Sequence, residues 1–117
     1  MVNNEIVEIQ YFVGGFQMKA VWNNSVVTEA NNEDLIYVEC NWYFSPDSIH
    51  KEFFTLSDEH TTCFWKGEAN YYNIDVVGTV NESAAWYYPT PMNGSIERVK
   101  KDLANYVAFW RGVEVNE

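Results

Sequence analysis

Turn-forming residues interrupt this chain at short intervals. Clusters of Asn, Gly and Pro separate apolar segments that are only a few residues long, and turns that recur roughly every 8–12 residues are typical of β-rich domains. No apolar run approaches the roughly 20 residues that a membrane-spanning helix needs. We therefore predict a mainly β fold: a single compact domain of strongly bent antiparallel sheets with one C-terminal helix.

The length and the aromatic content indicate one domain with its own core. The chain has 117 residues, 47% of them apolar, and contains 5 Trp, 8 Tyr and 7 Phe. This length corresponds to a single domain, and the apolar surface of so many rings is enough to offset the entropy of ordering the chain. We expect residues 1–117 to form one domain without repeats or linkers.

The first strands are predicted around the Asn23-Asn24 pair. Met18–Trp22 and Ser25–Glu29 flank this pair, and Asn tolerates the left-handed backbone of a two-residue hairpin turn. Leu35–Cys40 is predicted as a further strand because apolar and polar residues alternate along it. This strand would place Glu39 on a sheet surface.

The middle of the chain is predicted to alternate between turns and strands. Ser45-Pro46-Asp47 resembles a helix start and predicts one short helical turn. Ser57–His60 is predicted as a turn. Thr62–Lys66 and Glu68–Val77 are predicted as two strands broken at Gly67, where a glycine within a strand pattern indicates a bulge or a close backbone approach.

The C-terminal part contains the predicted helix. Ser95 can cap a helix that runs to about Asn105, since apolar residues recur there at helical spacing. Val107–Trp110 and Val113–Val115 are predicted as closing strands on either side of a glycine.

The charge distribution excludes some partners. The net charge of −10 repels phosphate backbones and anionic membrane surfaces, so we expect no nucleic-acid partner and no membrane association. The N-terminal segment lacks the features of an export signal, which favours a cytoplasmic location. Cations concentrate in the second half of the chain, where an anionic ligand would have to bind: Lys66, Arg98, Lys100, Lys101 and Arg111.

The cysteines and histidines do not form a recognisable metal or disulfide motif. Cys40 and Cys63 stand apart, and His50 and His60 lack a third ligand at metal spacing. We therefore expect no metal, no cofactor and two free thiols. Cys63 is interpreted chiefly as a small buried hydrophobe. The alternative is a nucleophile activated by a nearby cation.

An aromatic segment, Ala84–Pro91, contains three consecutive rings beside two prolines. Such a segment forms either a rigid part of the core or the wall of a ligand pocket, where Trp and Tyr combine apolar faces with one polar group each. Glu39 and Lys66 are the polar groups that we expect to converge at this pocket from neighbouring strands. They would bind an anionic group and hold it in place, or provide a base.

Several short motifs occur in an order that resembles the domain-of-unknown-function family 427. They are Met18-Lys19-Ala20-Val21-Trp22-Asn23, Val38-Glu39-x-Asn41, Tyr43-Phe44, Cys63-x-Trp65-Lys66-Gly67, Ala84-Ala85-Trp86-Tyr87-Tyr88-Pro89 and Val107-Ala108-Phe109-Trp110. The resemblance covers about residues 18–115. It implies a compact, mainly β domain of a kind found in bacteria and fungi and sometimes labelled nucleotidyltransferase-like. This chain has no Gly-Ser pair followed by an Asp-x-Asp pair.

The resemblance also implies a set of residues that share a pocket. These candidate ligand-binding residues are Glu39, Tyr43, Cys63, Trp65, Lys66, Tyr72, Trp86 and Tyr88. Our leading hypothesis is a cytoplasmic domain with an aromatic-walled pocket for a small polar or anionic molecule, acting as an enzyme or a binder. The alternative is a non-catalytic interaction module whose aromatic surface forms a homodimer or binds a partner.

Overall fold

A computed structural model describes residues 16–117, and its first element is the predicted hairpin. Strands β1 (Gln17–Trp22) and β2 (Ser25–Asn31) pair in antiparallel fashion. Asn23 and Asn24 close the hairpin with left-handed φ angles of 50° and 63°, as the sequence predicts. Strand β9 (Glu114–Asn116) pairs with the other edge of β1 and completes a three-stranded sheet, in the order β2-β1-β9.

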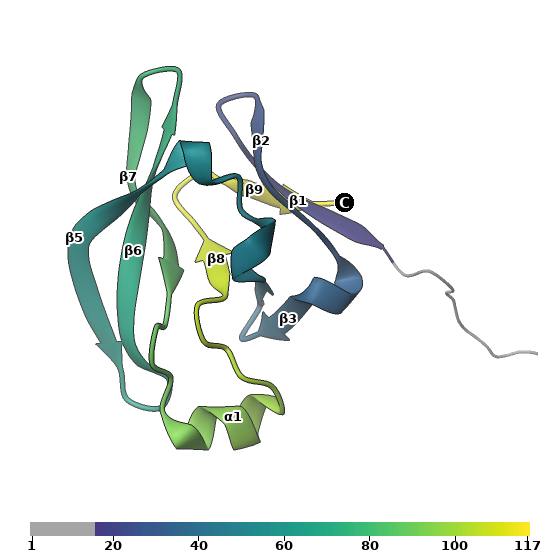
Figure 1. Cartoon of the computed structure of the whole chain (residues 1–117), viewed down its shortest axis with the longest axis vertical. Coiled ribbons are helices and arrows are strands. Elements are labelled where there is room, and N and C mark those ends of the chain that lie inside the picture. Colours follow the sequence, from purple (N-terminus) through teal and green to yellow (C-terminus); the bar gives the residue numbers. More distant parts are fainter. Residues whose placement is uncertain (1–15) are drawn as a thin grey trace, which may run out of the picture.

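The other strands form a six-stranded antiparallel sheet. Its members are β3 (Leu35–Val38), β4 (Asn41–Phe44), β5 (Phe54–Cys63), β6 (Gly67–Val76), β7 (Thr79–Tyr87) and β8 (Val107–Phe109). Their order is β3-β4-β8-β7-β6-β5. The late strand β8 therefore lies between β4 and β7 and joins two hairpin regions that precede it in the chain (Figure 1).

The helical elements are short. Three 3₁₀ turns, η2 (Asn32–Asp34), η3 (Pro46–Ser48) and η4 (Lys51–Phe53), connect strands, and η3 confirms the helical turn predicted at Pro46. The helix α1 (Asn93–Val99) lies at the end of the molecule opposite the β1–β2 and β6–β7 turns (Figure 1).

Helix α1 is shorter than the predicted helix from Ser95 to about Asn105. It ends because Lys100 adopts a left-handed φ of 70° and donates its N–H to the carbonyl of Ile96, a common helix termination. The Asp102 carboxylate then accepts the N–H of Ala104 at 2.9 Å. This local bond stabilises a turn where helix was expected.

Two predictions for the segment between residues 57 and 67 are wrong: the turn at Ser57–His60 and the strand at Thr62–Lys66. Ser57–His60 lies within β5, where the pairing with β6 shifts register between Leu56 and His60. Because of this shift in register, the polar residues that suggested a turn remain within the strand. The chain turns later. Cys63 pairs with Gly67 as the last pair of the β5–β6 hairpin, so residues 64–66 form its turn.

A third correction concerns Glu39. The predicted strand Leu35–Cys40 ends at Val38, and Glu39 and Cys40 form the two-residue turn between β3 and β4, with φ angles of 51° and 68°. Both residues thus have the left-handed backbone of this hairpin turn. Glu39 lies at the tip of a hairpin and not on a sheet surface.

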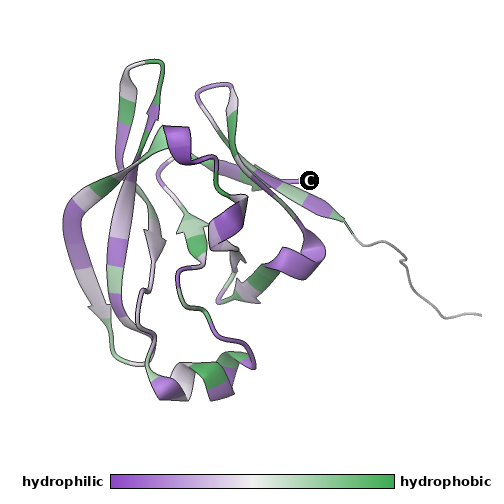
Figure 2. Cartoon of the chain, in the orientation of Figure 1, coloured by the Kyte–Doolittle hydropathy of each residue, from purple (hydrophilic) through white to green (hydrophobic). Residues whose placement is uncertain are grey.

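Two hydrophobic clusters pack on the six-stranded sheet, in keeping with the alternating polar and apolar bands along its strands in Figure 2. The first cluster joins this sheet to the three-stranded sheet and includes Ala20, Val27, Phe44, Ile74 and Phe109. The second includes Tyr43, Tyr71, Tyr88, Leu103 and Ala108. Chain neighbours such as Tyr43 and Phe44 belong to different clusters, as strand alternation requires.

The mainly β fold with antiparallel sheets is confirmed, and α1 is the single α-helix of residues 16–117. That the sheets are strongly bent remains a prediction, and residues 1–15 of the predicted domain lie outside the described part. Within residues 16–117 there is no helix with the length and apolar character to cross a membrane.

Candidate functional site

The site is a small cavity whose walls are mostly aromatic. It has a volume of about 170 Å³. Its lining residues are Asn41, Tyr43, Lys66, Tyr71, Trp86, Tyr88 and Trp110. Most of them come from β4, β6 and β7 or directly follow β7 and β8, so strands from the middle of the six-stranded sheet form the wall.

Register explains why these rings share one side of the sheet. Tyr71 lies opposite Trp86 in the β6–β7 pairing, and Tyr88 follows two residues after Trp86, which returns it to the same face. The indole N–H of Trp86 donates to the Tyr43 hydroxyl at 3.2 Å. Trp86 also meets Tyr43 and Trp110 edge to face, with ring centroids 6.2 and 5.8 Å apart.

Backbone contacts fix the position of Lys66. Its carbonyl accepts the N–H of Met92 at 3.0 Å. The next residue, Gly67, has a φ of +116°, and a Cβ at this position would lie 3.3 Å from the carbonyl oxygen of Thr90. A side chain at residue 67 would be both strained and crowded. The predicted close backbone approach at Gly67 is therefore confirmed.

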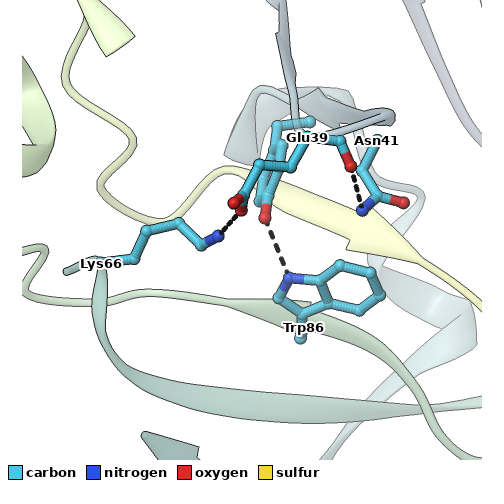
Figure 3. Close-up of polar contacts among 5 residues, drawn as sticks. Glu39, Asn41, Lys66 and Trp86 are labelled. Carbon is cyan, nitrogen blue, oxygen red and sulfur yellow. Dashed lines mark hydrogen bonds and ion pairs between the residues drawn. The ribbon is translucent and has the colours of Figure 1, made fainter. Parts of the chain in front are cut away.

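The Lys66 ammonium group pairs with the Glu39 carboxylate (Figure 3). It also lies over the Trp65 and Tyr88 rings, 4.5 and 5.8 Å from their centroids, within the range of cation–π attraction. Glu39 and Lys66 meet as expected, but only Lys66 lines the aromatic cavity, whereas Glu39 lines a separate depression together with Trp65. The elements differ from the prediction, because the pair joins two hairpin turns, β3–β4 and β5–β6, from opposite edges of the sheet.

The two members of the ion pair differ strongly in exposure. The Lys66 side chain is 8% exposed and the Glu39 side chain 54%. A buried ammonium needs a compensating charge or hydrogen-bond acceptor, whereas a half-exposed carboxylate remains hydrated. Lys66 therefore depends on Glu39 more than Glu39 depends on Lys66. The Arg98 guanidinium lies 4.3 Å from the Trp65 centroid and lines the same depression as Glu39.

Burial keeps the pocket phenols protonated. It raises the pKa of Tyr88 well above its usual value, and the neighbouring Tyr43 and Cys63 add to this effect. Burial also raises the pKa of Tyr43, although the hydrogen bond from Trp86 and the charge of Lys66 partly oppose the rise. Both hydroxyls are therefore neutral at physiological pH and can donate a hydrogen bond.

The remaining candidates occupy different positions. Cys63 and Trp65 are half-buried and pack on the second cluster. Tyr72 does not line the cavity. It lies in the first cluster on the opposite face and stacks on Tyr87, with centroids 4.6 Å apart. Tyr72 follows Tyr71 directly along β6, so the two side chains point to opposite faces of the sheet, and only Tyr71 reaches the pocket.

Sequence reasoning missed three lining residues: Asn41, Tyr71 and Trp110. The position of Tyr71 follows from its pairing with Trp86, a register that the sequence alone does not show. Trp110 is held by its indole N–H, which donates to the carbonyl of Ser83 at 2.6 Å. Its neighbour Phe109 packs on the opposite face, and this alternation was the available signal for Trp110.

A larger depression of about 650 Å³ lies elsewhere and is less suited to an anionic ligand. Its lining includes the acids Glu29, Asp34 and Asp47 and contains no lysine or arginine. Among residues 16–117, no group of three His, Cys, Asp or Glu side chains is arranged to hold a metal ion.

The fold and the cavity define a small, mainly β domain with a lysine-containing aromatic pocket. The comparison with protein families agrees with the motif order. A family model described as domain of unknown function DUF427 matches residues 16–116, and the chain belongs to this family. No curated protein matches the chain.

Proposed function

We propose that this protein is a cytoplasmic domain that binds a small polar or anionic molecule in the aromatic-walled pocket around Lys66. The observation that carries the proposal is a buried lysine in the lining of an aromatic cavity. Most lysines are exposed because removing their charge from water is costly. Lys66 is 6% exposed when the whole residue is counted, and it borders the open space of the pocket. It is therefore well placed to receive an anionic group.

The walls support a binding role. Apolar pockets with a few convergent polar groups are typical of small-molecule sites. Here the polar groups are the Lys66 ammonium, the Asn41 amide and the hydroxyls of Tyr43 and Tyr88. The neighbouring carboxylate of Glu39 would let the site act as a base as well, and turnover of the bound compound would then make the domain an enzyme.

A thermal-shift screen against nucleotides, sugars, amino acids and small carboxylates tests this proposal. We expect at least one compound to raise the unfolding temperature of the wild-type protein and to lose this effect in Trp86→Ala. Trp22→Ala, which removes an indole that packs on the first cluster, is the matched control and should keep the response. If no compound shifts the wild-type protein, or if both variants respond like it, the proposal is wrong.

A second candidate function is an interaction module that binds a second copy of the chain or another protein. Exposed aromatic side chains favour it, since Phe64 is 87% exposed and Tyr37 57% exposed and aromatic residues are enriched in interfaces. Light scattering over a range of concentrations tests it. A dimer that dissociates in Phe64→Ser would support this function, and a monomer at all concentrations would contradict the homodimer.

A further inference from the structure

We propose that the pocket binds a small carboxylic acid with a single ring, and that the ligand carboxylate replaces the Glu39 carboxylate, which does not itself line the cavity, as the partner of the Lys66 ammonium group. This inference rests on the proposed function, because it names the class of molecule that the Lys66 pocket accepts. It also gives Glu39 a definite role, which is that of an internal competitor for Lys66.

The size of the cavity points to one ring. Its volume is about 170 Å³, close to that of an engineered protein cavity of about 150 Å³ that binds benzene. The pocket is open to solvent, so a bicyclic or nucleoside ligand would have to extend beyond it, whereas a single ring fits within it. The walls agree, because the five rings of Tyr43, Tyr71, Trp86, Tyr88 and Trp110 present aromatic faces and edges to a planar guest.

The hydrogen-bond donors point to a carboxylate. The Lys66 ammonium has three N–H donors, and Glu39 takes one of them. The Tyr43 hydroxyl accepts from Trp86, which leaves its own proton free to donate. No partner within residues 16–117 hydrogen-bonds to the Tyr88 hydroxyl. Donors thus outnumber acceptors at this end of the pocket, as an anionic oxygen pair requires.

Glu39 is the group that can leave. Its side chain is 54% exposed and belongs to a two-residue turn, so its carboxylate regains water when it separates from Lys66. Lys66 remains buried and needs an anionic partner throughout. Displacement therefore exchanges one carboxylate for another on Lys66, and the ligand ring adds the burial of apolar surface that Glu39 does not provide.

Titration with benzoate, followed by protein NMR, tests the inference. Benzamide serves as a neutral ring and acetate as a carboxylate without a ring. We expect benzoate to bind more tightly than either compound and to change the chemical shifts of the indole signals of Trp86 and Trp110. Glu39→Gln should tighten benzoate binding on the order of tenfold, because apparent affinity rises when the binding-competent state, in which Glu39 does not hold Lys66, is more populated.

Matched variants separate this effect from a change in overall charge. Glu114→Gln removes the same charge from an exposed residue of β9 in the other sheet and should leave benzoate affinity within about twofold of wild type. Lys66→Met and Lys66→Gln should abolish benzoate binding, and near-ultraviolet circular dichroism checks that each folds. Lys51→Met, at an exposed lysine in η4, is their control.

The outcomes distinguish the two proposals. If benzoate binds but Glu39→Gln leaves its affinity unchanged or weakens it, Glu39 is not a competitor, while the pocket stands. A benzoate complex whose crystal structure retains the Glu39–Lys66 contact would equally exclude Glu39 as a competitor. If another small molecule binds in the pocket and benzoate does not, the ligand class is wrong and the proposed function stands. If nothing binds, both fail.

Discussion

The two faces of the six-stranded sheet carry similar rings but differ in what lies among them. We call the side of Phe44, Tyr72 and Tyr87 the packed face and the side of Tyr43, Tyr71 and Trp86 the pocket face. On the packed face, Phe44 is fully buried and meets Phe109 at a centroid distance of 5.6 Å. On the pocket face, the rings surround a cavity of about 170 Å³ that Lys66 borders.

This difference shows that a high aromatic content does not by itself produce a pocket. Rings pack to the density of the protein interior when nothing among them needs water or a counterion. An ammonium group among rings changes this, because its burial has to be compensated by a counterion, which here is the half-exposed carboxylate of Glu39. Lys66 and its partner Glu39 thus mark the face where space remains open.

The largest test of the comparison removes one ring from each face. Phe44→Ala should lower the free energy of unfolding by about 3–5 kcal/mol because it leaves a cavity in a filled core. Trp110→Ala should cost only about 1–2 kcal/mol, since Trp110 is 41% exposed and borders existing space. Urea unfolding of both variants measures the difference, and equal losses would mean that the two faces are packed alike.

A smaller effect is expected from the two members of the ion pair. Glu39→Ala should lower the free energy of unfolding by about 1–3 kcal/mol, because it leaves the Lys66 ammonium buried without its partner. Lys66→Met should change it by less than about 1 kcal/mol, because Glu39 is already half-exposed and an apolar side chain suits the aromatic walls. Thermal and urea unfolding of both variants measure the two changes in the free energy of unfolding, and equal losses would contradict the prediction.

The turn that carries Glu39 is strained and can be relaxed. Cys40 has a φ of 68°, a conformation that is unfavourable for a side chain with a Cβ. Cys40→Gly should therefore raise the free energy of unfolding by about 1 kcal/mol. Asn24→Gly, in the turn of the β1–β2 hairpin, is the control and should change it by only a few tenths, since Asn already tolerates this backbone. A loss of stability in Cys40→Gly would contradict the argument.

The smallest effect concerns alkaline pH and compares Tyr88 with Tyr72. Burial raises the pKa of both phenols above that of the unfolded chain. Their contribution to stability is complete below pH 10 and declines above it, because the unfolded chain loses phenolic protons that the folded chain retains. Just above pH 10, Tyr88→Phe should reduce this decline by on the order of 0.5 kcal/mol.

Unfolding titrations between pH 8 and about pH 11 would measure this effect. Tyr72→Phe should also flatten the decline, but less, because Tyr88 has the larger rise in pKa. If the stability of wild type and Tyr88→Phe fell in parallel above pH 10, the phenol of Tyr88 would titrate normally in the folded protein.

Local sequence signals predicted the parts of the fold that depend on neighbouring residues. The Asn23-Asn24 turn and the 3₁₀ turn at Pro46 are examples, since both residue types favour the observed backbone. The Glu39-Cys40 turn escaped prediction because neither residue favours a left-handed backbone. Its geometry follows from the pairing of Val38 with Asn41, and pairing is a tertiary property.

The same limit applies to the site. The aromatic segment Ala84–Pro91 predicts Trp86 and Tyr88 as pocket residues, and the family resemblance adds Lys66 to the same pocket. The choice between Tyr71 and Tyr72 required the register of β6 against β7. A shift of one residue exchanges the two faces, and no feature of an adjacent Tyr-Tyr pair determines which ring enters the pocket.

The central place of β8 has a consequence for how this protein is made. Synthesis proceeds from the N terminus, so the β3–β4 hairpin and the β5–β7 strands leave the ribosome before Val107–Phe109 follows to join them. Until then β4 and β7 each present an unpaired edge. Nascent chains stalled before Val107 should therefore be prone to aggregation and in need of chaperones, although nearly every lining residue of the pocket has already been synthesised.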